Sequence, residues 1–142
     1  MKIFETSRDL PARPEEVFAA ISAPERLARW WGPEGFTNTF SVCEFKEGGR
    51  WSLIMHGPDG KSWPNENRFA AIEAPRLVII EHVAEPKYRL TVTLTPTPAG
   101  TRVGWSQAIE NDDVASRIEP IVVPANEQNL QRLEAEVLRK DR

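Results

Sequence analysis

Polar side chains that could bind a ligand or transfer a proton fall on otherwise apolar faces of two predicted strands. In the segment Val103–Ile109, Gln107 shares one face with Trp105, because alternate residues of a strand point the same way. In the segment Leu77–Val83, the same alternation places His82 on the apolar face. A buried amide or imidazole without a partner costs about 1–3 kcal/mol. These groups are therefore expected to bond to each other, to water or to a ligand.

A third polar side chain, Asn126, stands at the head of an apolar stripe in the C-terminal segment. Leu130, Leu133 and Val137 follow it at helical spacing. Two or three polar groups that converge in an apolar cavity orient a ligand and make its binding specific. The alternative is that Asn126 and His82 lie at the ends of their elements and reach solvent.

The sequence contains five tryptophans, two of them adjacent in the stretch RWWGPEGFT. Neighbouring residues point about 100° apart on a helix and to opposite faces on a strand, so Trp30 and Trp31 cannot fill the same place in a core. We expect one ring to dock a short helix onto the sheet and the other to form the rim of a cavity, and we assign the rim to Trp31. Trp51 and Trp105 lie on inward strand faces, with Met55 on the same face as Trp51. They are expected to line the cavity, with ordinary core packing as the alternative.

Metal binding and nucleophilic catalysis have no supporting pattern. His56 and His82 are the only histidines, no HxH or HExxH spacing occurs, and a single cysteine cannot build a zinc cluster. No GxSxG motif is present, and Cys43 has no flanking base that would activate it. We therefore expect no metal and no cofactor. A general acid–base role for His82, with Glu66 or Glu81 beside it, stays open because histidine suits proton transfer near neutral pH.

Composition and charge favour an ordinary globular protein and argue against several classes of partner. Of 142 residues, 40% are hydrophobic and 27% charged. No apolar run approaches the ~20 residues that span a bilayer, and the N-terminus lacks the apolar core of a signal peptide. The net charge is -3 without any block of lysine and arginine, so neither nucleic acid nor a membrane is expected as a partner. A single cysteine fits a reducing compartment. We expect one domain over residues 1–142, cytoplasmic, as a monomer or homodimer.

The elements that must position these side chains follow from changes in periodicity. A strand over residues 3–10 precedes two short helices that begin at Pro14 and Pro24, because proline suits the first helical turn. From Thr37 onward the period changes to two, and short turns separate the apolar segments, as in an antiparallel meander. The predicted strands cover residues 39–45, 50–56, 67–73, 77–83, 88–95 and 102–109.

The C-terminal region is predicted to hold two helices. The run Asn111–Asp113 can cap a short helix that Pro120 ends. A long amphipathic helix then follows from about Pro124 to Arg139. An antiparallel sheet needs its apolar face covered, and a long amphipathic helix can cover it.

Several motifs along the chain resemble one known family. The sequence is similar to homologues of the activator of the heat-shock protein 90 ATPase, within the START-like or SRPBCC superfamily of helix-grip proteins. The resemblance extends over roughly residues 2–140. It rests on Trp30–Pro33, Gly35–Thr37, Gly48–Trp51, Met55–Gly60, Pro64–Asn65 and Pro75–His82.

The resemblance implies an α+β helix-grip fold, with a curved antiparallel sheet of about six to seven strands, two short helices and a long C-terminal helix. Members of the superfamily bind sterols, lipids, hormones or polyketides between the sheet and the long helix, and some are cyclases or hydrolases. Relatives often carry Gly-Trp at the start of the last helix, where this sequence has Ala125 and Asn126. We therefore expect the cavity to open beside the second short helix and to favour a flat ligand with one polar group.

The leading hypothesis is that the protein binds a small apolar or aromatic molecule in that cavity. A cyclase- or hydrolase-type enzyme acting in the same cavity and a chaperone-stimulating interaction module remain alternatives. The expected ligand-binding residues are Trp31, Trp51, Met55, His82, Trp105, Gln107, Asn126 and Leu130.

Overall fold

The computed structural model describes residues 1–139 as one curved antiparallel sheet with three helices. The predicted α+β class is confirmed, and the sheet has seven strands where about six to seven were predicted. Lys140, the last residue of the predicted resemblance, lies outside the described residues. In chain order the elements are β1 (Lys2–Leu10), α1 (Pro14–Ser22), α2 (Pro24–Trp30), β2 (Thr37–Cys43), β3 (Arg50–His56), β4 (Ser62–Glu73), β5 (Leu77–His82), β6 (Tyr88–Thr97), β7 (Gly100–Ile109) and α3 (Asp112–Val137).

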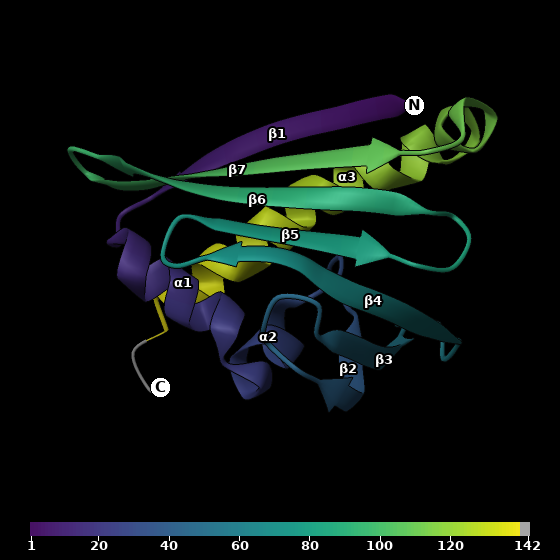
Figure 1. Cartoon of the computed structure of the whole chain (residues 1–142), viewed down its shortest axis with the longest axis horizontal. Coiled ribbons are helices and arrows are strands. Elements are labelled where there is room, and N and C mark those ends of the chain that lie inside the picture. The colour runs from purple at the N-terminus through teal and green to yellow at the C-terminus, as the bar shows by residue number, and fades with distance from the viewer. Residues whose placement is uncertain (140–142) are drawn as a thin grey trace.

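The strands pair in the order β1-β7-β6-β5-β4-β3-β2, and every neighbouring pair is antiparallel. Strands β2 to β7 therefore form the predicted meander, and β1 closes the sheet beside β7. Helix α3 crosses behind the sheet, while α1 and α2 lie together at one end of it (Figure 1). This arrangement encloses the core between one face of the sheet and the three helices.

Both short helices begin where the sequence predicted. Pro14 and Pro24 occupy the first helical turns of α1 and α2, where their missing N–H groups cost no hydrogen bond. Helix α2 ends at Trp30, and Gly32 then adopts a φ of 96°, a left-handed conformation that favours glycine. The chain can therefore turn sharply after the tryptophan pair.

Strand β4 begins at Ser62, earlier than the predicted start at Asn67. Its first residues pair with β3, including Pro64 opposite Ile54. Because β5 pairs with β4 only from Asn67 onward, the first part of β4 is an edge of the sheet. An edge tolerates a proline, which is why the turn-like sequence before Asn67 still forms a strand.

The predicted break in the C-terminal region is wrong: α3 is one helix that runs through both Pro120 and Pro124. The predicted cap at its start is confirmed, because the Asn111 side chain accepts a hydrogen bond from the Val114 amide at 3.0 Å. The prolines are exposed and four residues apart, so both lie on the outer face. A carbonyl that loses its N–H partner to proline there, such as that of Ser116, can be solvated, and the helix continues.

The core combines rings from the sheet with aliphatic residues from the helices. Fully or almost fully buried members of the core include Trp51, Phe69, Val103, Leu130 and Leu133.

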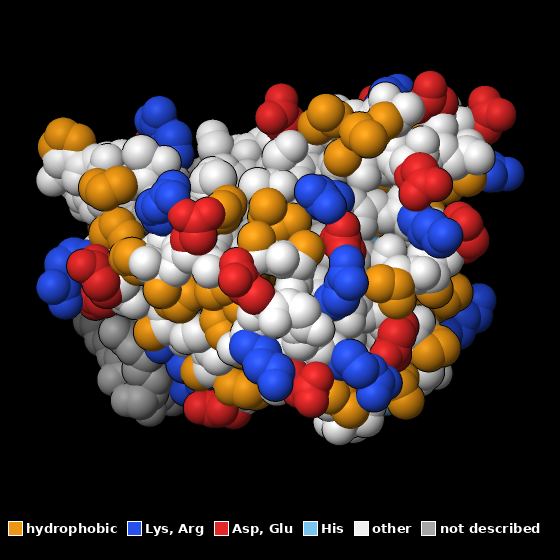
Figure 2. Space-filling view, viewed as in Figure 1, with side chains coloured by type: hydrophobic (Ala, Val, Ile, Leu, Met, Phe, Trp, Pro, Cys, Tyr) orange, Lys and Arg blue, Asp and Glu red, His pale blue; other side chains and the backbone are white. Residues whose placement is uncertain are grey.

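The surface is mixed in charge. Lysine and arginine alternate with acidic side chains over the face seen in Figure 2. None of the described helices is long and apolar enough to cross a bilayer.

Candidate functional site

The adjacent tryptophans at the end of α2 have different neighbours. The Trp30 indole N–H donates a hydrogen bond to the Ala20 carbonyl of α1 at 2.9 Å, and its ring meets Trp105 edge-on at 6.3 Å. Trp31 also contacts Trp105, at 6.0 Å, but it packs most closely against Trp51, with ring centroids 4.8 Å apart, and lines a cavity. Trp30 thus docks the short helices onto the core, and Trp31 forms part of a wall.

The loop after α2 is wrapped around one arginine of α3. The Arg132 guanidinium donates hydrogen bonds of 2.8–3.1 Å to five backbone carbonyls. Burial lowers the pKa of Arg132, and the nearby Glu34 carboxylate opposes that shift. Five bonds from one planar fork fix the loop more firmly than a single ammonium group could. The accepting carbonyls belong to Arg29, Trp31, Gly32, Pro33 and Phe36.

A second α3 side chain binds the same loop. Buried Asn129 accepts from the Gly32 amide at 3.3 Å and donates to the Trp30 carbonyl at 3.1 Å. The amide therefore uses both its oxygen and its nitrogen on the backbone around the tryptophan pair. The position of Trp31 is set by α3 and not by α2 alone.

A cavity of about 210 Å³ lies beside this loop, between the sheet and the first half of α3. Most of its wall is aliphatic or aromatic, and none of the described residues that line it carries a charge at neutral pH. It is bounded by Ile118, Ile121, Val122, Ala125, Asn126 and Asn129 of α3, by Met55, Tyr88, Leu90, Trp105 and Gln107 of the sheet, and by Trp31, Gly32, Pro33 and Pro86 of loops.

Two of the predicted polar residues meet at the edge of the cavity. The Asn126 side-chain nitrogen of α3 donates a 3.1 Å hydrogen bond to the Gln107 side-chain oxygen of β7. Gln107 is 9% exposed and Asn126 is half-buried. The amides thus satisfy each other in part, which was one of the three arrangements expected for buried polar groups.

The predicted ligand-binding residues divide into those that line this cavity and those that do not. Trp51 and Leu130 are fully buried behind it, and the Trp51 ring stacks on Phe69 with centroids 5.4 Å apart. His82 lies elsewhere. The cavity brings together the other five, namely Trp31, Met55, Trp105, Gln107 and Asn126.

His82 is held in a separate network at the end of β5. Its Nδ1 lies 2.8 Å from the Ala84 carbonyl and 2.9 Å from the Pro86 carbonyl, so Nδ1 carries the proton. Its Nε2 lies 3.0 Å from the Asn65 side chain, and its ring stacks on Tyr88 at 4.9 Å. Tyr88 thus faces the cavity, while the imidazole faces a loop.

The two carboxylates considered as partners for that imidazole bind other groups. Glu81 accepts hydrogen bonds of 2.6 Å from Arg68 and Arg89, which hold the pKa of Glu81 below its usual value. Glu66 accepts from the Ser52 hydroxyl, which lowers the pKa of Glu66. Both side chains form ion pairs on the sheet, so neither makes the acid–base pair with His82 that the sequence left open.

The sequence matches one family model over most of its length. The model for the Activator of Hsp90 ATPase homolog 1-like proteins covers residues 11–137. The chain belongs to this family. Among curated proteins, no significant match is found.

Solved structures share the family's fold across nearly the whole chain. A protein from Nitrosomonas europaea is 21% identical with a TM-score of 0.87, over 98% of this chain and 95% of that one. A protein from Arthrobacter aurescens is 25% identical with a TM-score of 0.87, over 95% of this chain and 85% of that one. An AHSA1-like protein from Aeromonas hydrophila is 20% identical with a TM-score of 0.78, over 98% and 96%. The predicted family and the helix-grip fold are confirmed.

In this member of the Hsp90-activator homologue family, sequence reasoning missed one wall of the cavity. Ile118, Ile121, Val122 and Ala125 follow the i, i+3, i+4, i+7 spacing of one helical face. The stripe was hidden because a break was predicted at Pro120. A continuous helix would have extended the apolar face from the predicted long helix back toward Asn111.

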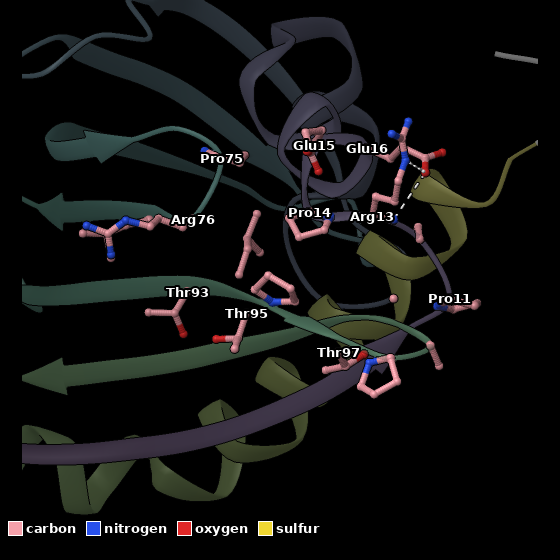
Figure 3. A pocket seen from close by; sticks show the side chains of 17 residues that line it. Pro11, Arg13, Pro14, Glu15, Glu16, Pro75, Arg76, Thr93, Thr95 and Thr97 are labelled. Carbon is pink, nitrogen blue, oxygen red and sulfur yellow. Dashed lines mark hydrogen bonds and ion pairs between the residues drawn. The ribbon is translucent and has the colours of Figure 1, made fainter.

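The protein also has a larger hollow, about 920 Å³ in volume, at the N-terminal end of α1 (Figure 3). It is an open groove between the start of α1 and the turns after β4 and β6. Its arginines are occupied, because Arg13 pairs with Glu16 and Arg76 pairs with Glu73. Among the described residues, no aromatic side chain lines the groove, whereas Trp31, Tyr88 and Trp105 line the smaller cavity, which we therefore take as the candidate site.

Proposed function

We propose that the protein binds a small apolar or aromatic molecule in the cavity between the sheet and α3. The observation that carries the proposal is an apolar space of about 210 Å³ with a single amide pair at its edge. An apolar cavity of about 150 Å³ is large enough to bind benzene, whereas drug-sized ligands need about 300 Å³ or more. The occupant is therefore a molecule of one or two rings, or a short chain.

Burial of the ligand supplies the affinity. Each ~100 Å² of apolar surface removed from water contributes about 2.5 kcal/mol. After the cost of association, a ligand of this size reaches affinities in the micromolar range. That range suits a carrier or sensor that must release its ligand.

The composition of the cavity favours binding over acid–base catalysis. Among the described residues that line it, Tyr88 is the one side chain that can titrate. Burial raises the pKa of Tyr88 to about 12, so the phenol stays neutral under physiological conditions. The amides of Gln107 and Asn126 do not transfer protons near neutral pH, which leaves a cyclase or hydrolase without a general base.

The test is a titration with a panel of aromatic and fatty ligands, followed by tryptophan fluorescence. Wild type is expected to respond to at least one ligand, and Asn126→Trp is expected to fold but lose the response because the indole fills the cavity. Gln131→Trp adds the same ring at an exposed position of α3 and should bind like wild type. Equal responses from all three proteins, or no response from any, would contradict the proposal.

A further inference from the structure

The amide pair in the cavity leaves two polar groups without a partner. The bond from Asn126 to Gln107 uses one N–H of Asn126 and the oxygen of Gln107. No other described residue bonds to the Gln107 nitrogen or the Asn126 oxygen. Neither atom is sealed in the core, because neither is among the buried atoms without a partner. Both side chains line the cavity, so their free groups are available to a ligand there.

This conclusion does not depend on which way the amides are turned. Oxygen and nitrogen of a side-chain amide can be exchanged without changing its shape. If both amides are turned, Gln107 donates to Asn126, and the free groups become a Gln107 oxygen and an Asn126 N–H. In either arrangement, two amides joined by one hydrogen bond leave one whole NH2 group and one carbonyl oxygen without a partner.

The other residues that line the cavity disfavour a charged ligand. An ionised ligand in this cavity would lose solvation and gain no opposite charge, since the described lining residues are all neutral. The Arg132 guanidinium, which lies next to the lining residue Gly32, is already engaged because it binds five backbone carbonyls. A neutral polar edge is the group that this site can satisfy.

We infer that the cavity recognises an uncharged, flat molecule that carries an N–H and a C=O side by side, as the edge of a cyclic amide does. The Gln107–Asn126 pair bonds to that edge, and the rings of Trp105 and Trp31 with the α3 aliphatic residues cover the rest. The inference rests on the proposed function and adds the ligand's chemical class and the residues that select it.

The test compares 2-quinolone, which has such an edge, with naphthalene, which has the same ring shape without it. Dissociation constants are measured by NMR titration for wild type, Gln107→Leu and Asn126→Leu. Each substitution should weaken 2-quinolone binding about tenfold and leave naphthalene binding within about twofold, because only 2-quinolone loses a hydrogen bond. Gln131→Leu removes an exposed amide from the same helix and should change neither constant.

Charge is tested with 2-naphthoate, which should bind wild type at least about tenfold more weakly than naphthalene. Tighter binding of 2-naphthoate than of naphthalene would overturn the inference. So would substitutions that change both neutral probes alike, or neither, and in those cases the proposed function would stand because the probes still bind. Failure of all three probes to bind wild type would overturn the proposed function as well.

Discussion

The C-terminal half of α3 is fixed by buried side chains, whereas its N-terminal half lies over the cavity with little buried surface. Leu130, Leu133, Glu136 and Val137 are buried in the first of these regions. In the other, Ala115 is the one buried residue before Asn129, and Ile121 is 70% exposed. We call the part of α3 from Asn129 to Val137 the anchor, and the part before Asn129 the cover.

The difference shows how one element can serve both stability and binding. The anchor carries the polar contacts that fix the tryptophan loop, including those of Arg132 and Asn129. The cover contains Pro120 and Pro124, which each remove one helical hydrogen bond. Segments with few buried contacts and missing hydrogen bonds open at lower free energy than the core. Ligand entry is expected beneath the cover, with the anchor staying in place.

The largest difference should come from truncating one aliphatic residue in each half. Leu133→Ala creates a cavity in the core and is expected to lower the free energy of unfolding by about 3 kcal/mol. Ile121→Ala removes an exposed side chain and should cost less than about 0.5 kcal/mol. Urea denaturation measures both values. Similar losses for the two variants would show that the cover is packed as firmly as the anchor.

Loss of Arg132, which holds the loop after α2, should lower the free energy of unfolding nearly as much as Leu133→Ala does. Arg132→Met leaves five carbonyls without their donor and is expected to destabilise the fold by about 2 kcal/mol. Arg117→Met changes an exposed arginine of the cover and should be nearly neutral. Thermal unfolding compares the two variants, and equal melting temperatures would refute a special role for Arg132.

The stability that the anchor provides should also decrease at low pH. Burial raises the pKa of Glu136, but hydrogen bonds from Arg29 and Arg26 outweigh it, so its pKa in the folded protein is lowered. A lowered carboxyl pKa contributes stability that is present above the unfolded value of about 4.3 and is lost as pH falls through the folded value. Unfolding free energies measured from pH 7 to pH 3 should fall less steeply for Glu136→Gln, which should cost about 1–2 kcal/mol at pH 7. An unchanged slope would contradict this assignment.

The smallest expected effect is a gain in stability, on replacing a proline of the cover. Pro120→Ala restores an N–H that can bond to the Ser116 carbonyl and should stabilise the protein. The gain should not exceed about 1 kcal/mol, since the unfolded chain also gains conformational freedom, which offsets part of it. Hydrogen exchange should slow over residues 116–124 and stay unchanged over 129–137. Pro98→Ala, in the turn between β6 and β7, lacks this gain and serves as the control. Faster exchange in the cover after Pro120→Ala would argue against the proposed weakness.

Local patterns in the sequence predicted much of this architecture. Proline at the first turn placed the starts of α1 and α2, and alternation placed Trp105 and Gln107 on the inner face of β7. These signals are reliable because they depend on neighbouring residues only. The continuity of α3 was not predicted, since a proline's cost in a helix depends on whether its face meets solvent or a packed surface.

Sequence alone determined the family, the fold and five of the residues around the cavity, because periodicity and motif are properties of the chain itself. Tertiary structure alone decided how the tryptophan pair is held and where His82 points. The carbonyl partners of Arg132 lie 96 to 103 residues away, and no local pattern distinguishes that arginine from a solvated one. His82 shares the inward face of β5 but turns to a loop, because two carbonyls beyond its own strand accept hydrogen bonds from its Nδ1–H. The Arg132 contacts arise only when the loop after α2 and α3 come together in the fold, whereas the carbonyls that bind His82 lie only two and four residues after it and depend on how the loop after β5 turns.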